Sequence, residues 1–289
     1  MKAREGDGTR ETAQPTTIGY EWHLPPPYFV KTEGFGSRDQ SRVPVLEAAC
    51  SRPIQVPGAC YIVTQRVLDI VLSTVALLVC SPVILLIGVL VKWNSPGPVL
   101  FRQVRIGINR RREANIGCLG VERRREDLFG RPFMLYKFRT MYSNARELFP
   151  ALYQYSYNDE ELAQLPIKIL VSDKQASRDP RITPFGRWLR RSSLDEVPNF
   201  LNVLKGDMHL VGPRPDITQN IRYYSAAHMR KLGVKPGLTG LAQIRGRGNL
   251  SFLQTNENDI EYVDNRSLVL DLRILLKTIA ITCRAIGAY

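Results

Sequence analysis

The sequence predicts a mixed α/β domain that is associated with a membrane. Three observations lead to this prediction: an uncharged apolar run at 70–91, two short strand-like stretches at 99–105 and 133–140, and helical patterns beyond residue 180. The chain of 289 residues, 44% of them hydrophobic, is long enough to bury a sizeable core. Residues 1–62 are rich in proline, glycine and threonine, so we expect a disordered tail there and a folded domain at 63–289.

The apolar run is long enough to cross a bilayer core as a helix. Ser81 and Pro82 lie near its middle, and a helix must kink there because Pro82 lacks an N–H group and crowds the carbonyl of Leu78. The run can therefore span the membrane, or it can enter and leave on one face as a re-entrant hairpin. The Ser81 hydroxyl can supply a hydrogen bond to the broken backbone. Basic residues follow the run closely, which places its C-terminal side in the cytoplasm.

The chain is strongly basic, with 40 lysines and arginines, 27 acidic residues and a net charge of +13. Such an excess fits nucleic acid, anionic lipid headgroups or phosphorylated substrates. Part of it lies in a basic loop at 109–131, which holds two arginine triplets, and a helical inserted segment is expected at 142–172. Five scattered cysteines without a C-x-x-C pair argue against a disulfide framework or a zinc site.

The second half of the chain predicts several helices. Thr183 and Pro184 are typical of a helix start, and this helix should end near residue 191. A second helix is expected at 195–204, where apolar residues recur at helical spacing, and Gly206 should end it. Two further helices are expected, at 217–232 and 268–285. The last of these is either a core helix or one that lies in the lipid headgroup layer.

Two adjacent carboxylates, Asp195 and Glu196, lie near the expected start of the second helix. Ser193 stands three residues before Glu196, which is the pattern of a capping box, so the pair can simply satisfy backbone N–H groups. The functional alternative uses the same place, because a helix N-terminus can hold a phosphate. A carboxylate in that position can attack phosphorus and form an acyl phosphate. Mg²⁺ often takes one or two carboxylates plus substrate phosphate, and Glu196 can serve in that role.

Four basic residues are candidates for binding a substrate phosphate: Lys137, Arg139, Arg190 and Arg214. The planar fork of arginine binds two phosphate oxygens at once. Arg214 lies between Pro213 and Pro215, and these prolines fix the backbone around it and so lower the entropic cost of holding its side chain. Taken alone, the same turn could also be an ordinary one with a solvent-facing arginine.

Several sequence blocks occur in order along the chain. They are the apolar run with Ser81 and Pro82, FRQVRIG at 101–107, YKFRTM at 136–141, the stretch at 179–208, GPRP at 212–215 and KPGLTGLAQIRGRG at 235–248. Together they resemble the bacterial sugar transferases, the monotopic phosphoglycosyl transferases that act on polyprenyl phosphate, and the resemblance covers residues 63–285. Two departures, Leu241 where that family usually has tryptophan and Arg245 where it often has asparagine, leave the choice of sugar open.

The resemblance implies a chemistry. Asp195 would attack the β-phosphorus of a UDP-sugar and release UMP, and undecaprenyl phosphate would then take the phosphosugar from the aspartate. This is the first membrane step of exopolysaccharide or glycan assembly. Glu196 matches the second acid of the family's pair, which acts with Mg²⁺, and Asp195 is the other expected metal ligand. The residues expected to bind phosphate or nucleotide are Arg190, Arg214, Lys137, Arg139, Pro213 and Pro215.

The resemblance also implies a compact mixed α/β domain with one re-entrant membrane helix at 66–92, broken at Ser81 and Pro82, and with amphipathic helices in the membrane interface. Both ends of that helix then lie in the cytoplasm. The catalytic domain is expected on the cytoplasmic face of the bacterial inner membrane, in contact with membrane lipid, and the oligomeric state, including a homodimer, stays open. The alternative is a membrane-tethered protein that binds anionic lipid or nucleic acid through its charge, whereas no nucleic-acid partner is expected for the enzyme.

Overall fold

The structure is a computed structural model of the chain. The residues that it describes are 57–108, 130–153, 158–164, 179–225, 227–246 and 248–283. Most of the expected tail, nearly all of the basic loop with its arginine triplets, and much of the inserted segment lie outside the described residues. Within the inserted segment the structure describes three short helices, which are α3 (Ala145–Leu148), the 3₁₀ helix η1 (Pro150–Tyr153) and α4 (Asp159–Gln164).

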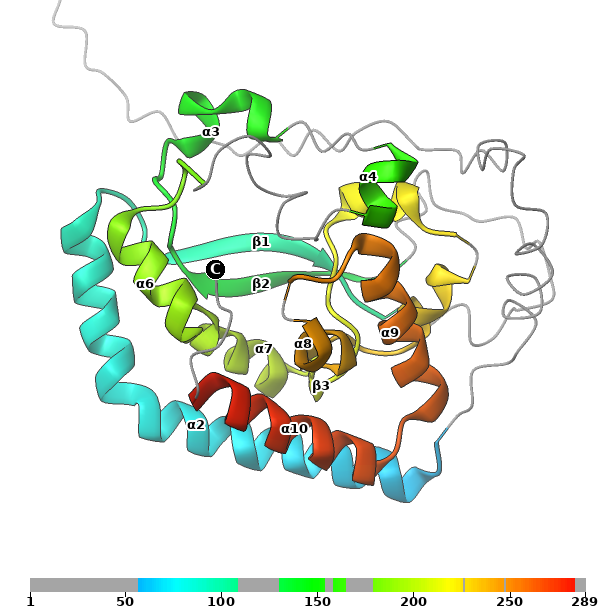
Figure 1. The fold of residues 1–289 in the computed structure, drawn as a ribbon. Helices are drawn as coiled ribbons and strands as arrows, with labels where there is room; N and C mark the ends of the chain where they lie inside the picture. The colour runs from blue at the N-terminus through cyan, green and yellow to red at the C-terminus, as the bar shows by residue number, and fades with distance from the viewer. Residues whose placement is uncertain are drawn as a thin grey trace, which may run out of the picture.

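The first described element is the long helix α2 (Ala59–Asn94), which contains the whole apolar run. It begins within the last residues of the expected tail and is longer than the predicted segment at 66–92. Among the described residues it is the one helix that is long and apolar enough to cross a membrane, and most of its large apolar side chains are exposed. Figure 1 shows that its two halves run in different directions, one along α10 and the other up the side of the domain.

The change of direction in α2 has a local cause in its sequence. Pro82 lies inside the helix and has no N–H group to offer to the carbonyl of Leu78. The Ser81 hydroxyl donates a hydrogen bond to that same carbonyl at 2.8 Å. The missing backbone bond at Pro82 and the expected compensation by Ser81 are therefore both present, within a helix that runs continuously from Ala59 to Asn94.

Polar contacts fasten the N-terminal half of α2 to the domain. Asp69, which is 1% exposed, accepts a hydrogen bond from the backbone N–H of Leu210 at 2.8 Å and lies 2.5 Å from Nδ1 of His209. The guanidinium group of Arg66 donates to the carbonyls of Val203 and Leu204, both at 2.7 Å. One face of this half of the helix is therefore bound to the domain through polar side chains.

Two small sheets form the centre of the domain. The two predicted strand-like stretches form strands β1 (Leu100–Ile106) and β2 (Pro132–Phe138), which pair antiparallel. Strands β3 (His209–Val211) and β4 (Gly237–Thr239) pair parallel and were not predicted. The side chains that pack the core around β2, β3 and α10 are Phe133, Leu135, Val203, Met208, Leu210, Val211, Leu241, Tyr262 and Ile274.

Three consecutive helical elements follow the inserted segment: α6 (Pro184–Ser192), the 3₁₀ helix η2 (Leu194–Asn199) and α7 (Phe200–Lys205). Thr183 caps α6 by accepting from the N–H of Gly186 at 2.9 Å, which confirms the predicted start. Gly206 ends α7 with a positive φ of 79°, also as predicted. The expected single helix at 195–204 is instead divided, because its first five residues, 195–199, belong to the tighter 3₁₀ helix η2.

The helical segment predicted at 217–232 is present only in part. The chain there forms two 3₁₀ helices, η3 (Thr218–Tyr223) and η4 (His228–Gly233). Between them the Ser225 hydroxyl accepts from the N–H of His228, and the His228 ring accepts from the N–H of Ser225. These side-chain contacts take the place of helical backbone bonds, so a continuous helix does not form.

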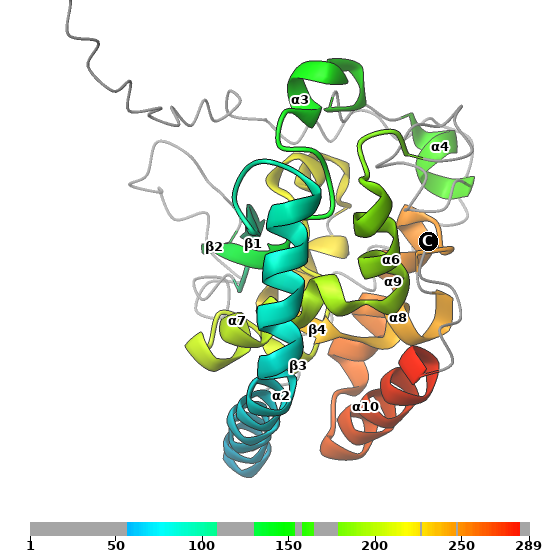
Figure 2. The ribbon, with the colours of Figure 1, turned by 90° about the vertical axis from the view of Figure 1, so that its left-hand side faces the viewer.

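The last described helices are α8 (Leu241–Gly246), α9 (Phe252–Asn265) and α10 (Leu268–Cys283). Ser251 and Gln254 form a capping box at the start of α9. Helix α10 is amphipathic, since Asp271 and Ile274 are buried while other apolar side chains of the helix are exposed. Figures 1 and 2 show α10 beside the N-terminal half of α2, and the Tyr61 hydroxyl of α2 donates to Asp271 at 2.8 Å. The exposed apolar side chains of α10 are Val269, Leu272, Leu276 and Ile279.

Candidate functional site

Asp195 and Glu196 lie in η2, immediately after a sharp turn of the backbone at Ser193. Ser193 has φ 59°, and it is the one non-glycine residue with positive φ among those described. Its N–H donates to the carbonyl of Arg190 at 3.3 Å, so it ends α6. The expected capping box of Ser193 and Glu196 is therefore wrong, because a left-handed Ser193 makes no side-chain cap. A left-handed serine is unfavourable on its own, and such positions often occur at functional sites.

The two carboxylates have different electrostatic surroundings. Asp195 is 8% exposed, and burial, followed by the negative charge of Glu196, raises its pKa to about 6, although Lys137 and Arg190 pull it down. Burial also acts to raise the pKa of Glu196, but Lys137 and Arg214 outweigh it and hold that pKa below its usual value. Nζ of Lys137 lies 2.5 Å from Oε1 of Glu196. At neutral pH the pair thus carries one firmly ionised acid and one that titrates close to physiological pH.

Strand β2 and helix α7 hold this turn in place. Asn202 of α7 is fully buried. Its amide group donates to the carbonyl of Met134 at 2.6 Å and accepts from the N–H of Tyr136 at 3.1 Å. One side chain thereby bonds α7 to the edge of β2 as a neighbouring strand would. This keeps η2, which directly precedes α7, against the strand that carries Lys137.

Arg190 lies on α6 and precedes the carboxylate pair in the sequence, whereas the Arg214 turn follows the pair. Its Nε donates to the Thr140 hydroxyl at 2.9 Å. Because Nε is held in this way, the orientation of the guanidinium group is fixed relative to β2. The positive charge of Arg190 lowers the pKa of Asp195, so the structure brings this predicted residue to the site.

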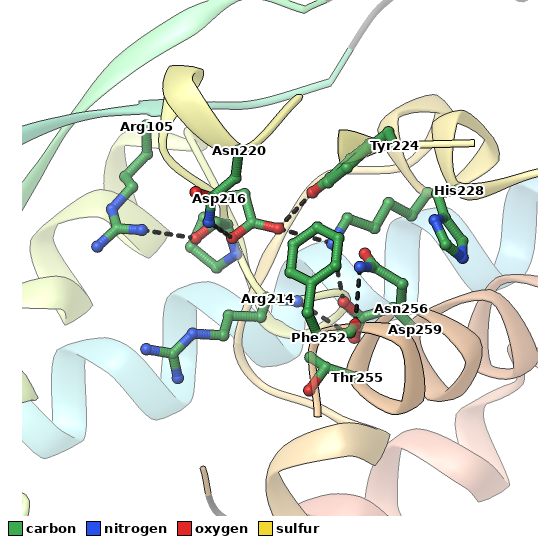
Figure 3. A network of polar contacts seen from close by, with 12 residues as sticks. Arg105, Arg214, Asp216, Asn220, Tyr224, His228, Phe252, Thr255, Asn256 and Asp259 are labelled. Carbon is green, nitrogen blue, oxygen red and sulfur yellow. Dashed lines mark hydrogen bonds and ion pairs between the residues drawn. The ribbon is translucent and has the colours of Figure 1, made fainter. Parts of the chain in front are cut away.

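The turn at residues 212–215 is fixed by its backbone. Gly237 donates to the carbonyl of Pro213 at 2.8 Å, and the N–H of Arg214 points to Asp259 at 3.4 Å. A guanidinium N–H of Arg105 donates to the carbonyl of Pro215 at 3.2 Å. Figure 3 shows the guanidinium groups of Arg105 and Arg214 directed to the same side, away from Asp259. Pro213 and Pro215 thus serve through their carbonyls as well as through their rigid rings.

A buried network of charged side chains supports this turn, because Asp259, which faces the N–H of Arg214, belongs to it. Nζ of Lys231 lies 2.9 Å from Asp216 and 3.3 Å from Asp259, and all three side chains are almost fully buried. The Tyr224 hydroxyl donates to Asp216 (Figure 3). Burial raises the pKa of Asp259 to about 6, whereas at Asp216 the lysine outweighs burial and the pKa is lowered. A paired, hydrogen-bonded network of this kind is rigid, because moving one member leaves the others uncompensated.

Arg139 does not take the phosphate-binding position that the sequence predicted for it. Its guanidinium group is buried at the C-terminal end of α2, where it donates hydrogen bonds to Pro96 O at 2.8 Å and to Ser95 O at 2.5 Å. The side chain is therefore directed to the carbonyls that follow α2. Of the four predicted cations, the structure brings Lys137, Arg190 and Arg214 to the carboxylate pair.

Arg105 and Thr140 are two residues of the site that the sequence did not single out. The positive charge of Arg105 lowers the pKa of Glu196, as do the charges of Lys137 and Arg214. A signal for it existed, since Arg102 and Arg105 stand three apart in a strand and so lie on opposite faces. Arg102 is exposed and Arg105 is half-buried. Thr140 gave no such signal, because its role depends on contact with α6.

The donors at the pair fit a magnesium ion that is shared with a substrate. Among the described residues no group of three or more His, Cys, Asp and Glu side chains could hold a metal. Lys137 already binds Oε1 of Glu196, which leaves the other Glu196 oxygen and the Asp195 carboxylate as donors. Mg²⁺ commonly takes one or two carboxylates and completes its shell with phosphates and water.

A buried carboxylate among fixed lysine and arginine side chains suits the binding and transfer of a phosphorylated group. The sequence profile of the bacterial sugar transferase family matches residues 60–285. The chain therefore belongs to the bacterial sugar transferases and is an enzyme of this family, as the ordered sequence blocks predicted.

Named relatives agree with this assignment. The chain is 36% identical over 225 residues to the exopolysaccharide production protein ExoY of Rhizobium meliloti, which covers 78% of this chain and 88% of that protein. It is 36% identical over 233 residues to the UDP-glucose:undecaprenyl-phosphate glucose-1-phosphate transferase of Caulobacter vibrioides, covering 78% and 72%. The protein of the same name from Escherichia coli K12 is 37% identical over 227 residues, covering 74% of this chain and 39% of its own length.

Proposed function

We propose that this enzyme transfers a sugar 1-phosphate from a UDP-sugar to a polyprenyl phosphate and releases UMP, as an early membrane step of exopolysaccharide assembly. The names of the Caulobacter and Escherichia relatives, which specify UDP-glucose and undecaprenyl phosphate, support this donor and acceptor. The observation that carries the proposal is Asp195, a buried carboxylate whose pKa of about 6 leaves it ionised at neutral pH beside Lys137 and Arg190.

In the first step a carboxylate oxygen of Asp195 attacks the β-phosphorus of the UDP-sugar. The bond between the β-phosphorus and the bridging oxygen breaks, and UMP leaves with that oxygen and its electron pair. The product is an acyl phosphate that links Asp195 to the sugar. Lys137 and Arg190 face the attacking group, so they offset the repulsion between a carboxylate and an anionic diphosphate.

In the second step an oxygen of the polyprenyl phosphate attacks the same phosphorus. The bond from phosphorus to Asp195 breaks, its electron pair returns to the carboxylate, and the polyprenyl diphosphosugar is released. Arg214 and Arg105 lie near Glu196 rather than Asp195, and we assign them to the diphosphate of the donor. Each bidentate guanidinium can bind two phosphate oxygens.

We further propose Mg²⁺ as the cofactor, held by Glu196 and Asp195 together with substrate phosphate. A bound Mg²⁺ supplies charge neutralisation for the phosphate oxygens during transfer. The protein's own contribution is the firmly ionised state of Glu196, which Lys137 and Arg214 maintain against burial.

The setting that we propose is the cytoplasmic face of the bacterial inner membrane, with α2 as a re-entrant helix. The helix changes direction (Figure 1), and it contains Pro82 with Ser81 bonded across the break. Its exposed apolar side chains and those of α10 lie on neighbouring helices. We propose that this shared apolar surface rests in the lipid, with α10 in the interface.

The test is intact-mass measurement of the enzyme with UDP-glucose and Mg²⁺. We expect a mass increase equal to one hexose phosphoryl group, which is a hexose phosphate less one water, with release of UMP, and loss of the added mass when undecaprenyl phosphate is supplied. Asp195→Asn should form no adduct, while Glu160→Gln, which changes an exposed acid on α4, should behave as the parent does. Turnover by Asp195→Asn at the parent rate would refute the covalent route.

A further inference from the structure

The end of the membrane helix is built around one arginine side chain. Arg139 donates from Nη1 to Pro96 O at 2.8 Å and from Nη2 to Ser95 O at 2.5 Å, to the Ser95 hydroxyl at 3.0 Å and to Val91 O at 3.3 Å. Three of these acceptors are backbone carbonyls. Val91 O also accepts from the N–H of Ser95 at 3.3 Å, whereas the carbonyls of Ser95 and Pro96 lie just beyond the last residue of α2. The arginine, which directly follows β2, therefore terminates α2 from more than forty positions further along the chain.

The loop after α2 is shaped to hold this guanidinium group. Gly97 has φ 117°, and a Cβ atom at this position would lie 2.2 Å from Nη1 of Arg139. Only glycine allows both this backbone conformation and this close approach. The side chain of Lys92 also donates to Gly97 O at 3.3 Å. The loop and the arginine thus form a close-fitting contact rather than a chance one.

The residues on either side of Arg139 reach the carboxylate pair. Two positions earlier, Lys137 binds Glu196 at 2.5 Å. One position later, the Thr140 hydroxyl holds Nε of Arg190, and the Thr140 carbonyl accepts from Thr183 at the start of α6. Gly186 of α6 approaches that carbonyl so closely that a Cβ there would lie 2.1 Å from it. Residues 137–140 therefore bind the end of α2 through Arg139, supply one of the cations that face Asp195, which is Lys137, and hold the other, Arg190, through Thr140.

We propose that Arg139 is a positioning residue that couples the seating of the membrane helix to the geometry of the carboxylate pair, through Lys137 on one side and Thr140 with Arg190 on the other. A shift of the loop after α2 moves Arg139, and the short backbone between positions 137 and 140 transmits that shift to both cations. The catalytic part of this inference rests on the proposed sugar-phosphate transfer, whereas the coupling itself does not.

The coupling is tested by hydrogen exchange on the full chain in vesicles of phosphatidylethanolamine and phosphatidylglycerol. In Arg139→Met we expect amides of 184–199 to exchange at least about fivefold faster while those of α9 keep their rate, because only the local structure is loosened. Ser95→Ala, which removes one acceptor and is far milder, should show the same pattern to a smaller degree. Unchanged exchange at 184–199 overturns the proposal. Equal acceleration in α9 also overturns it, since Arg139 would then only stabilise the whole domain.

The catalytic part is tested by a double-mutant comparison of UMP release from UDP-glucose. Arg139→Met should lower kcat/KM by about tenfold in the parent but by less than about threefold when Lys137 is already methionine, because residues that act through one another are not additive. Arg139→Lys keeps the charge without the fork and should not restore activity. Arg102→Met, on the exposed face of β1, is the control and should stay within about twofold of the parent.

A full tenfold loss in both backgrounds, or restoration by lysine, overturns the catalytic part. If the parent chain releases no UMP from any UDP-sugar, the proposed function fails, and the exchange measurement still decides whether Arg139 couples helix and site.

Discussion

Nζ of Lys137 lies 2.5 Å from Oε1 of Glu196, and this ion pair joins strand β2 to the turn that carries Asp195. The lysine lowers the pKa of both carboxylates, yet the outcome differs. The pKa of Glu196 stays below its usual value, while the pKa of Asp195, whose side chain is less exposed to solvent, is raised to about 6. One cation thus helps to separate two adjacent acids into different roles.

Loss of that cation should impair the first chemical step. Lys137→Met removes the positive charge that faces both acids, so we expect UMP release to fall by about a hundredfold, the scale seen when one fixed charge-stabilising donor is deleted. UMP is measured in single-turnover reactions with UDP-glucose. The matched control is Lys205→Met, which removes the neighbouring lysine that binds the Tyr136 hydroxyl. Equal losses in both variants would mean that Lys137 has no special place in the reaction.

Formation of the adduct should depend on pH through Asp195. Only the carboxylate form attacks, and its pKa is raised to about 6, so Asp195 is mostly protonated below pH 6 and ionised above it. The rate should therefore rise between pH 5 and 7 with a midpoint near 6. Lys137→Met should move this midpoint to higher pH, because the lysine favours the charged form. A rate that does not change over this range would contradict the assignment of Asp195.

Arg105 should bind the donor although it lies outside the four cations that the sequence predicts. It supports the Arg214 turn through Pro215 O and contributes positive charge at Glu196. Arg105→Met should raise KM for UDP-glucose by about tenfold or more, the effect of losing one charge-assisted contact. Initial rates over a range of donor concentrations give this number. Arg102→Met on the other face of the same strand should leave KM within about twofold.

The re-entrant topology can be checked with Cys60, which is exposed at the start of α2. If the helix leaves the membrane on the side it entered, an impermeant thiol reagent should not label Cys60 in intact cells of a Cys50→Ser variant. The same cells should be labelled once the inner membrane is opened. Pro82→Leu restores the missing N–H and favours a straight helix, so it should increase labelling of intact cells. Full labelling of the parent in intact cells would establish a spanning helix instead.

The elements that the sequence predicted well are those whose signals are local. The strands at 100–106 and 132–138, the Thr183 cap and the Gly206 end all depend on neighbouring residues. The parallel pair of β3 and β4 was missed because each strand has three residues and is defined by its partner. The helix expected at 217–232 was interrupted by side-chain contacts of Ser225 and His228.

The candidate site shows the same limit. Lys137 and Arg139 stand two positions apart in one motif and carry the same charge, so the sequence assigned both to phosphate. Their different partners, Glu196 for one and the end of α2 for the other, come from segments that are distant along the chain. Ser193 looked like a capping serine, but its left-handed backbone makes it the end of α6 instead.

The buried contact of Asp69 with His209 and with the N–H of Leu210 bears on how this enzyme can be handled. A chain that starts at residue 95 would lack this carboxylate and also Arg66, which binds the last carbonyls of α7. Unpaired polar groups and core side chains would then face water, so we expect such a chain to be insoluble in an expression trial. Helix α2 and the rest of the domain are in this sense one folding unit, and a version without α2 would require a redesigned surface around β3 and α7.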